Sequence, residues 1–451
     1  MKPTNSIIYL MMVGSLVSVN AFADTPIVEA VKTACQRRVD IGLFKGVAIG
    51  SIAPVTPPGP AVENTILCGE AKSEYEIYEL GSISKTFAGI ILAKFANQGL
   101  LDLDQPISIN LSELQGFDSG KITLRQLATH TSGLAREYSG SESAWLIDEP
   151  GLIEFLEKSN SLQFPVASYH YSNVGFGTIA LILSRVSQQS FQQLVQTEIL
   201  DPLGMGETGF MTTPTKPELL QGYDVLLNLS QYHQVSDLWA AAGGLTSDLY
   251  DMMIYLRANM HPDTSELGSA MTKSHDEGLG WDSKPGELPT WKNGAMTDGF
   301  STVIEFDPTK NLGTVVLGNE FSGPSMITIG SVAMGGEDTS TQLELSPDFQ
   351  KAVSGKYVTD DGQFEADIFP THQYFLGAQI PFHNGSLSIR LLSLVGETMK
   401  FSVDNGSDSA DRVLFVVDPL SQEMTLTYLE YKNNDEAGTP VYNSTVFRQK
   451  N

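Results

Sequence analysis

The chain has 451 residues, 41% of them hydrophobic and 18% charged, which is enough for two or three globular domains with buried cores. Its formal net charge is −26, which argues against nucleic acid or an anionic membrane surface as a partner. This charge excludes little about the substrate, because one local cationic pocket can coexist with an acidic exterior.

The N-terminal residues have the pattern of an export signal. Lys2 supplies a positive start, an apolar stretch runs from Ile7 to Val19, and Ala21-Phe22-Ala23 fits the small-x-small cleavage rule. We therefore expect residues 1–23 to be a signal peptide that is cleaved after Ala23. The mature protein is then expected to be periplasmic or secreted, with no stable membrane insertion. The alternative is that this segment is not cleaved and anchors the protein in the membrane, but its apolar stretch is short for spanning a bilayer.

Two cysteines, Cys35 and Cys68, follow this segment. An even count in an exported protein permits one disulfide. The bond would join a helix expected at Ile27–Arg38 to an early strand. The alternative is two buried free thiols, and the sequence leaves both states open.

The part of the chain before residue 335 has strand patterns at both ends and helical patterns between them. In chain order we expect strands at Gly46–Ala53, Thr65–Cys68 and Tyr75–Leu80, helices at Ser82–Gln98, Asn173–Ser190 and Leu249–Asn259, and strands at Thr302–Phe306 and Thr314–Leu317. This order predicts an α/β fold in which strands distant in sequence close one mixed sheet. Helices would flank the sheet, and an all-helical lobe would be inserted.

The tail differs, because short alternating runs there are separated by turn signals such as Asn384-Gly385 and Asp418-Pro419. The runs are Gln363–Ile368, Ser386–Leu392, Thr398–Val403, Val413–Val417 and Met424–Tyr428. The pattern is typical of a small all-β barrel or sandwich. We therefore expect a first domain over residues 24–335, a linker that starts at Gly335-Gly336-Glu337-Asp338, and a C-terminal β-domain over residues 345–451.

Several motifs that would indicate other chemistry are absent from the sequence. There is no His-Glu-x-x-His, and the seven histidines are scattered, so a zinc site has little support. The sequence also lacks a Gly-x-Ser-x-Gly elbow and a Walker sequence. We expect neither a metal nor a cofactor. His130 is expected to bond the backbone rather than take part in catalysis.

Gly81-Ser82-Ile83-Ser84-Lys85 lies where a predicted strand meets an apolar helix. Residues three apart share one face of a helix, so Ser82 and Lys85 can bring a hydroxyl and an amine together. A serine hydroxyl needs a base beside it, and a lysine is such a base when burial or another cation lowers its pKa. Alone, however, Ser-x-x-Lys is a weak signal, because it occurs by chance and Ser82 could be a helix N-cap.

A second motif, Tyr171-Ser172-Asn173, precedes a predicted helix. We assign the phenol of Tyr171 the relay of a proton between Ser82 and the leaving group. The amide of Asn173 would hold Lys85 or an amide of the substrate. These groups would supply the proton transfers that acylation of a serine requires.

A third motif, Trp291-Lys292-Asn293-Gly294, precedes a strand. Lys292 would depress the pKa of Lys85 or Tyr171 and attract a carboxylate of the substrate. Gly294 would let the substrate approach the strand edge closely. The backbone N–H groups of Ser82 and Ala295 would then form an oxyanion hole.

These three elements, Ser-x-x-Lys, Tyr-x-Asn and Lys-x-Gly in this order, resemble the penicillin-recognising serine hydrolases. The similarity is greatest to class C β-lactamases and low-molecular-weight penicillin-binding proteins of the D-Ala-D-Ala carboxypeptidase type. Four further stretches are similar to the family: Tyr78–Phe87, Ile122–Leu134, Asp201–Met205 and Ala242–Leu245. The resemblance covers roughly residues 24 to 335. It implies a sheet between helices and a helical lobe, with the site between them.

The resemblance also implies a role for each matching residue. Ser82 corresponds to the acylated nucleophile, with Lys85 and Tyr171 as the acid/base pair. Asn173 and Lys292 correspond to binding groups, and Ala295 to the oxyanion donor.

This sequence departs from the family pattern in two places. Asn293 stands where β-lactamases usually have a threonine whose hydroxyl helps to hold the substrate carboxylate. Related esterases often lack the lysine of this motif, so Lys292 favours substrates that bear a carboxylate. The tail after residue 345 resembles the lipocalin-like β-domain of some penicillin-binding-protein-like peptidases.

Several functions remain open at this point. The first is a carboxypeptidase or peptidase acting on D-amino-acid peptides, with or without activity on β-lactams, and the second is a dedicated class C-like β-lactamase. An esterase of the same superfamily is a further alternative. The non-enzymatic alternative is a catalytically silent peptidoglycan-binding protein. The sequence does not indicate the oligomeric state.

Overall fold

The structure is a computed structural model. It describes residues 26–54, 61–138, 144–158, 161–162, 165–210, 219–224, 227–230, 234–296, 299–338, 347–359, 361–363, 365–372, 375–382, 385–394, 397–404, 412–417, 424–434 and 440–449. The expected signal peptide lies outside the described residues. Within those ranges, no helix is both long and apolar enough to cross a membrane.

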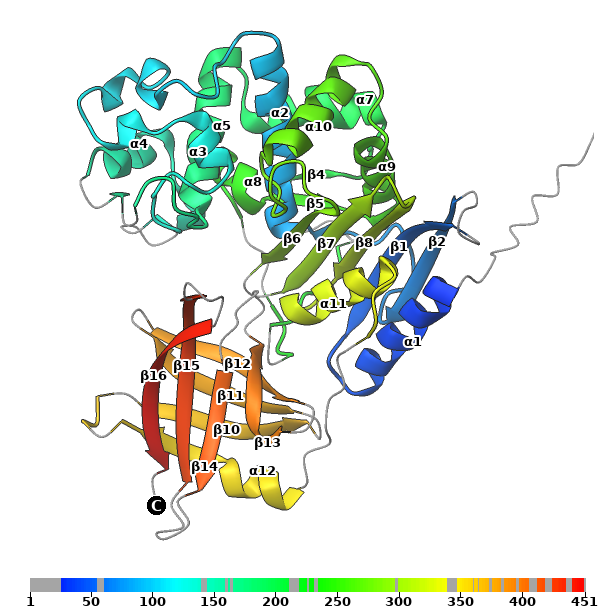
Figure 1. Cartoon of the computed structure of the whole chain (residues 1–451), viewed down its shortest axis with the longest axis vertical. Helices are drawn as coiled ribbons and strands as arrows, with labels where there is room; N and C mark the ends of the chain where they lie inside the picture. Colours follow the sequence, from blue (N-terminus) through cyan, green and yellow to red (C-terminus); the bar gives the residue numbers. More distant parts are fainter. Residues whose placement is uncertain are drawn as a thin grey trace, which may run out of the picture.

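Five strands form the main sheet, in the order β2-β1-β8-β7-β6 (Figure 1). They are β1 (Gly46–Pro54), β2 (Ala61–Gly69), β6 (Thr290–Met296), β7 (Phe300–Asp307) and β8 (Leu312–Gly318). The prediction that strands distant in sequence close the sheet is confirmed, because β1 pairs with β8. The prediction of a mixed sheet is wrong, because every neighbouring pair is antiparallel. The strands from β6 to β8 follow one another through short connections, which only antiparallel neighbours allow.

Helices cover both faces of this sheet (Figure 1). On one face α1 (Pro26–Asp40) and α11 (Gly323–Ala333) pack together, and their buried side chains share a core with β1 and β8. On the other face lie α2 (Ser84–Asn97), α9 (Leu249–Met260) and α10 (Glu266–Glu277). This arrangement confirms the predicted α/β fold with a sheet flanked by helices.

A helical lobe lies beside α2, as predicted (Figure 1). It includes α3 (Leu124–Ala128), α4 (Glu149–Glu157), α5 (Asn173–Ser187), α6 (Phe191–Val195), α7 (Asp201–Leu203), α8 (Asp237–Gly243), the short turns η2 (Ile107–Ile109), η3 (Ser112–Leu114), η4 (Ser119–Lys121) and η5 (Ala144–Leu146), and the π-turn η7 (Gln196–Leu200). Almost every residue of α2 is buried, because this helix lies between the sheet and the lobe. The N-terminus of α2 is therefore at the junction of the two parts.

The strand expected at Tyr75–Leu80 is much shorter in the structure. It is reduced to β3 (Tyr78–Glu79), which pairs with β5 (Leu245–Ser247) rather than with the main sheet. In turn, β5 pairs with β4 (Gly209–Phe210). The strand ends early because Gly81 adopts φ +53° and opens the 3₁₀ turn η1 (Gly81–Ile83), which leads directly into α2.

Cys35 of α1 and Cys68 of β2 form a disulfide, with 6.4 Å between their Cα atoms. This confirms the bonded state that the cysteine count allowed. At the end of the first domain, the guanidinium of Arg38 donates two hydrogen bonds to Asp338, at 2.8 and 3.1 Å. The start of the expected linker is therefore held against α1.

In the tail, α12 (Pro347–Val353) is followed by eight strands in the closed order β10-β11-β12-β13-β14-β15-β16-β9. They are β9 (Gly355–Val358), β10 (Glu365–His372), β11 (Phe375–Phe382), β12 (Gly385–Leu394), β13 (Glu397–Asp404), β14 (Arg412–Val417), β15 (Met424–Asn434) and β16 (Pro440–Gln449). The sequence runs indicated five of these strands and missed β9, β11 and β16. The strand pattern of β9 is weak because this strand is short. The patterns of β11 and β16 are weakened by a proline within β11 and a proline at the start of β16.

Candidate active site

Ser82 lies in the tight turn between β3 and α2. The turn requires glycine at position 81, both for its positive φ and because a Cβ there would lie 2.7 Å from the backbone nitrogen of Ala295. On the side of β6, a Cβ added to Gly294 would lie 2.1 Å from the carbonyl oxygen of Leu80. The backbone of β6 is therefore pressed against the turn that carries Ser82. This places the N–H of Ala295 beside the residue that precedes Ser82.

The side chain of Lys85 is completely buried where α2, α5 and α8 meet. Its Nζ lies 3.0 Å from Ser82 Oγ, 2.7 Å from Asn173 Oδ1 and 2.5 Å from the carbonyl oxygen of Ala242. Burial, together with the nearby charge of Lys292, holds the pKa of Lys85 well below its usual value. A neutral amine at this distance is able to take the proton of the Ser82 hydroxyl.

Tyr171 contacts Ser82 from the side of the helical lobe. Its hydroxyl lies 2.5 Å from Ser82 Oγ, and Nζ of Lys85 and Nζ of Lys292 lie 4.9 and 5.1 Å from the centre of its ring. Burial raises the pKa of Tyr171, although the charge of Lys292 opposes the shift. The phenol is therefore protonated at neutral pH and can donate its proton.

His130 fixes the segment that carries Tyr171. Its Nδ1 accepts a hydrogen bond of 3.0 Å from the backbone N–H of Ser172, and its ring stacks on that of Tyr171 at 4.2 Å between centroids. Ser172 in turn caps α5, because its Oγ accepts from the N–H of Gly175 at 3.0 Å. Burial and the charge of Lys292 lower the pKa of His130, so its ring is neutral. The expectation that His130 bonds the backbone is confirmed.

Lys292 is also completely buried, and its amine forms an ion pair with Asp282. Asp282 accepts a further hydrogen bond of 3.2 Å from the backbone N–H of Asn293. Burial works against the charge of Lys292, but Asp282 outweighs it and holds the pKa of Lys292 above its usual value. The sequence interpretation missed Asp282, which lies ten residues earlier in the chain with no motif to mark it. Lys292 is therefore a charged but already paired lysine.

Ser82 opens into a cavity of about 340 Å³. The other residues that line it are Arg136, Glu137, Trp145, Asn173, Trp239, Ala242, Gly243, Ala295, Met296 and Phe321. Asn173 and Ala295 were expected here, whereas Lys292, Asn293 and Gly294 are not among the lining residues. Arg136, Glu137 and the two tryptophans were missed, because only the fold brings them to Ser82. Glu137 and Arg136 follow the Thr131-Ser132-Gly133 stretch, which was the one available signal.

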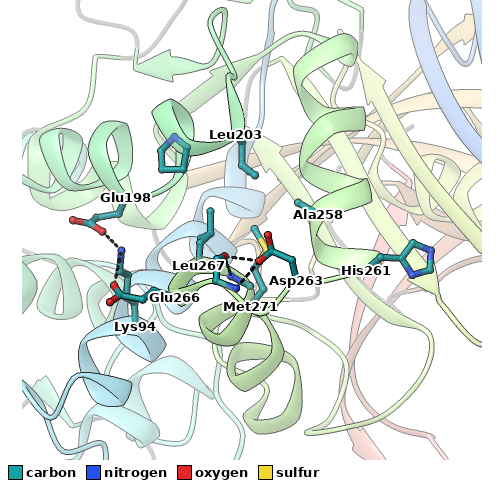
Figure 2. A pocket seen from close by; sticks show the side chains of 12 residues that line it. Lys94, Glu198, Leu203, Ala258, His261, Asp263, Glu266, Leu267 and Met271 are labelled. Carbon is teal, nitrogen blue, oxygen red and sulfur yellow. Dashed lines mark hydrogen bonds and ion pairs between the residues drawn. The ribbon is translucent and has the colours of Figure 1, made fainter.

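Figure 2 shows a different hollow, of about 400 Å³, where α2, α7, α9 and α10 approach one another. In this hollow Lys94 lies 2.5 Å from Glu198, and Asp263 accepts a hydrogen bond of 2.5 Å from the Ser265 hydroxyl. None of its lining residues belongs to the Ser-x-x-Lys, Tyr-x-Asn or Lys-x-Gly motifs. In the described part of the chain there is also no group of three or more His, Cys, Asp or Glu residues able to hold a metal. The cavity at Ser82 is therefore the candidate active site.

The contacts among Ser82, Lys85 and Tyr171 have the arrangement that a serine hydrolase requires. The sequence profile of the Beta-lactamase family matches residues 68–329, more than half of the chain. The chain belongs to that family. The match ends before the C-terminal β-strands begin.

Individual relatives agree with this assignment. The chain is 29% identical over 253 residues to a β-lactamase of Pseudomonas fluorescens, with 53% of this chain and 68% of the relative covered. It is 24% identical over 303 residues to a β-lactamase of Yersinia enterocolitica, with coverage of 56% and 76%. A solved structure described as a β-lactamase/D-alanine carboxypeptidase from Pseudomonas syringae has a TM-score of 0.60 at 19% identity, covering 68% of this chain and 98% of that chain. At this identity, the structural likeness shows the fold alone.

Proposed function

We propose that this chain is an exported enzyme that forms an acyl-enzyme at Ser82 and acts on D-amino-acid peptides, on β-lactams or on both. One observation carries the proposal: Ser82 Oγ lies within hydrogen-bond distance of both Lys85 Nζ, at 3.0 Å, and Tyr171 Oη, at 2.5 Å. A hydroxyl with a base on one side and a proton donor on the other has the groups that acyl transfer requires.

In the proposed reaction, Lys85 takes the hydroxyl proton of Ser82 while Oγ forms a bond to the carbonyl carbon of the substrate. The backbone N–H groups of Ser82 and Ala295 bind the resulting oxyanion. The bond from carbon to the leaving nitrogen then breaks, and Tyr171 gives its proton to that nitrogen. The proton on Lys85 passes back to Tyr171. Water later hydrolyses the ester on Ser82, releases the acid and restores the hydroxyl.

A side-by-side turnover assay tests the proposal and ranks the candidate substrates by how fast the enzyme turns them over. The purified protein is given nitrocefin, a D-Ala-D-Ala peptide and a simple p-nitrophenyl ester, and the intact mass is measured during each reaction. We expect an acyl adduct whose peptide map places it on Ser82, and faster turnover of the peptide or the lactam than of the ester. An adduct on any other residue, or none with all three compounds, contradicts the proposal.

An esterase that does not need a carboxylate on its substrate is the second candidate, because Lys292 is already paired with Asp282. Lys292→Ala separates the two candidates. If Lys292 anchors the substrate carboxylate, the variant should lose about tenfold or more in kcat/KM on the peptide and the lactam, with a smaller loss on the ester. Equal losses on all three compounds would contradict that role. They would indicate that Lys292 acts only through the pKa values of Lys85 and Tyr171.

The remaining parts of the proposal rest on the sequence. Residues 24–335 are proposed as the catalytic domain and residues 345–451 as a lipocalin-like β-domain, for which the closed order of strands is support. Export to the periplasm or the medium is supported by the signal-peptide pattern of residues 1–23. Arg136 lines the cavity, and its side chain is 63% exposed. It is therefore the first cation that a substrate carboxylate would contact.

A further inference from the structure

The two proposed oxyanion donors belong to different elements of the fold. The N–H of Ser82 is part of the turn η1, whereas the N–H of Ala295 is part of β6. An oxyanion hole works only when each donor lies about 2.7–3.1 Å from the place where the charged oxygen forms. The spacing between η1 and β6 must therefore be fixed closely.

The contact between η1 and β6 has a glycine on each side. A Cβ added to Gly81 would lie 2.8 Å from the carbonyl oxygen of Ala295, and a Cβ added to Gly294 would lie 3.1 Å from the backbone nitrogen of Ile83. The two backbones therefore meet at these positions without side chains between them. A hydrogen bond across the contact can set their distance where side-chain packing cannot.

Thr302 of β7 supplies such a hydrogen bond. It is paired directly with Gly294, is only 1% exposed, and donates from its Oγ1 to the carbonyl of Leu80 at 2.8 Å. A Cβ added to Gly294 would lie 2.5 Å from this Oγ1, so the hydroxyl uses the space that the glycine leaves open. The Leu80 carbonyl also accepts a longer bond of 3.3 Å from the N–H of Ile83. The Thr302 hydroxyl thus joins the main sheet to the turn that carries Ser82.

Two further hydrogen bonds of the turn lead to other elements. The N–H of Leu80 donates to the carbonyl of Leu245 in β5 at 2.8 Å, and Ser84 Oγ donates to the carbonyl of Gly81 at 2.7 Å. These bonds hold the turn to β5 and to the start of α2. Neither of them reaches the strand that carries Ala295.

We propose that Thr302 is a positioning residue whose hydrogen bond to the Leu80 carbonyl sets the distance between the N–H groups of Ser82 and Ala295. The inference rests on the proposed function, because it concerns the oxyanion hole of that same reaction. Thr302 acts through the two donors rather than on the substrate. Its effect should therefore fall on the transition state, in which the carbonyl oxygen carries charge, more than on binding of the substrate.

Thr302→Val tests the inference, because valine keeps the size and the branched Cβ of threonine but cannot donate to Leu80. Acylation is followed with nitrocefin and with p-nitrophenyl acetate, both of which change colour when Ser82 is acylated. We expect the maximal rate to fall about tenfold or more, while the half-saturating concentration changes less than about threefold. Thr302→Ser keeps the hydroxyl and should recover the wild-type rate to within about threefold.

Thr314→Val is the matched control in the same sheet. Thr314 is buried on β8, next to β7, and its Oγ1 donates to the carbonyl of Gly50 at 2.9 Å, so the variant loses a bond of the same kind. Thermal unfolding should show a similar loss of stability in Thr314→Val and Thr302→Val, but Thr314→Val should acylate Ser82 at the wild-type rate.

Three results would each overturn the inference. They are a wild-type maximal rate in Thr302→Val, a Thr302→Ser variant as slow as Thr302→Val, and a Thr314→Val variant as slow as Thr302→Val. If Thr302→Val does not fold, Thr302→Ala takes its place with the same expectations.

A separate measurement distinguishes failure of this inference from failure of the proposed function. Intact mass of the wild type is recorded after incubation with a penicillin and with p-nitrophenyl acetate. An adduct on Ser82 together with an unchanged rate in Thr302→Val overturns only the role of Thr302. No adduct with either compound overturns the proposed function, and the role of Thr302 falls with it.

Discussion

Ser82→Ala should abolish the covalent labelling of the protein by a fluorescent penicillin and lower turnover by about 10⁵-fold or more. The variant removes the atom that bonds to the carbonyl carbon, whereas the neighbouring Lys85 and Tyr171 have no alternative nucleophile to activate. Ser82 is only partly buried in the cavity wall, so loss of one oxygen should leave the fold intact. Labelling is read on a gel, and the adduct by intact mass.

Ser84→Ala is the matched control for this experiment. Ser84 is buried two residues away, and its Oγ donates to the Gly81 carbonyl at 2.7 Å and accepts from the Leu245 N–H at 3.1 Å. We expect that variant to be labelled at Ser82. We also expect it to unfold at a lower temperature, because its free energy of unfolding falls by about 1 kcal/mol for each lost hydrogen bond. An adduct that persists in Ser82→Ala would contradict the assignment of the nucleophile.

The predictable part of the site is the part with local sequence signals. The three-residue spacing predicted that Ser82 and Lys85 lie close together. In the structure Ser82 lies in η1 and Lys85 in the first turn of α2, with Oγ and Nζ 3.0 Å apart. Tyr171, in contrast, lies 89 residues from Ser82 in the chain and could be placed beside it only by resemblance to a family. Helical periodicity likewise located α1, α5 and α9 to within a few residues.

The parts that could not be predicted depend on contacts between distant segments. Asp282 pairs with Lys292, and Glu137 holds Asn173, but an isolated acidic residue has no pattern that names its partner. The error over the main sheet has the same origin. Strand patterns give the strands but not their directions, which follow from short connections between β6, β7 and β8 and from the return of β8 beside β1.

The pKa values of Lys85 and Lys292, both near Ser82, depend on the charges of their neighbours. Burial and the charge of Lys292 lower the pKa of Lys85, while Asp282 keeps Lys292 charged in a buried position. Asp282 therefore affects Lys85 in two opposing ways: it keeps Lys292 charged, and its own charge raises the pKa of Lys85. A buried ion pair is costly to form. Its retention next to Ser82 is consistent with a role in setting the protonation of the site.

Lys85→Met should slow acylation of Ser82 by about 10³-fold or more, because the variant keeps a long side chain but has no base. The fold is checked by thermal unfolding, since Asn173 Oδ1 and the Ala242 carbonyl both lose a donor. Lys94→Met is the matched control on the same helix. It removes an ion pair with Glu198 and should lower stability without slowing acylation.

The pH profile gives this prediction a second readout that a purely structural role for Lys85 would not move. Below its pKa Lys85 is an ammonium and cannot accept a proton, so kcat/KM of the wild type should rise with pH as the amine loses its proton. Because burial and Lys292 lower that pKa, the rise should lie well below the pH at which an ordinary lysine titrates. In Lys85→Met this rising limb should vanish from whatever activity remains. A limb that persists unchanged in the variant would mean that another group is the base.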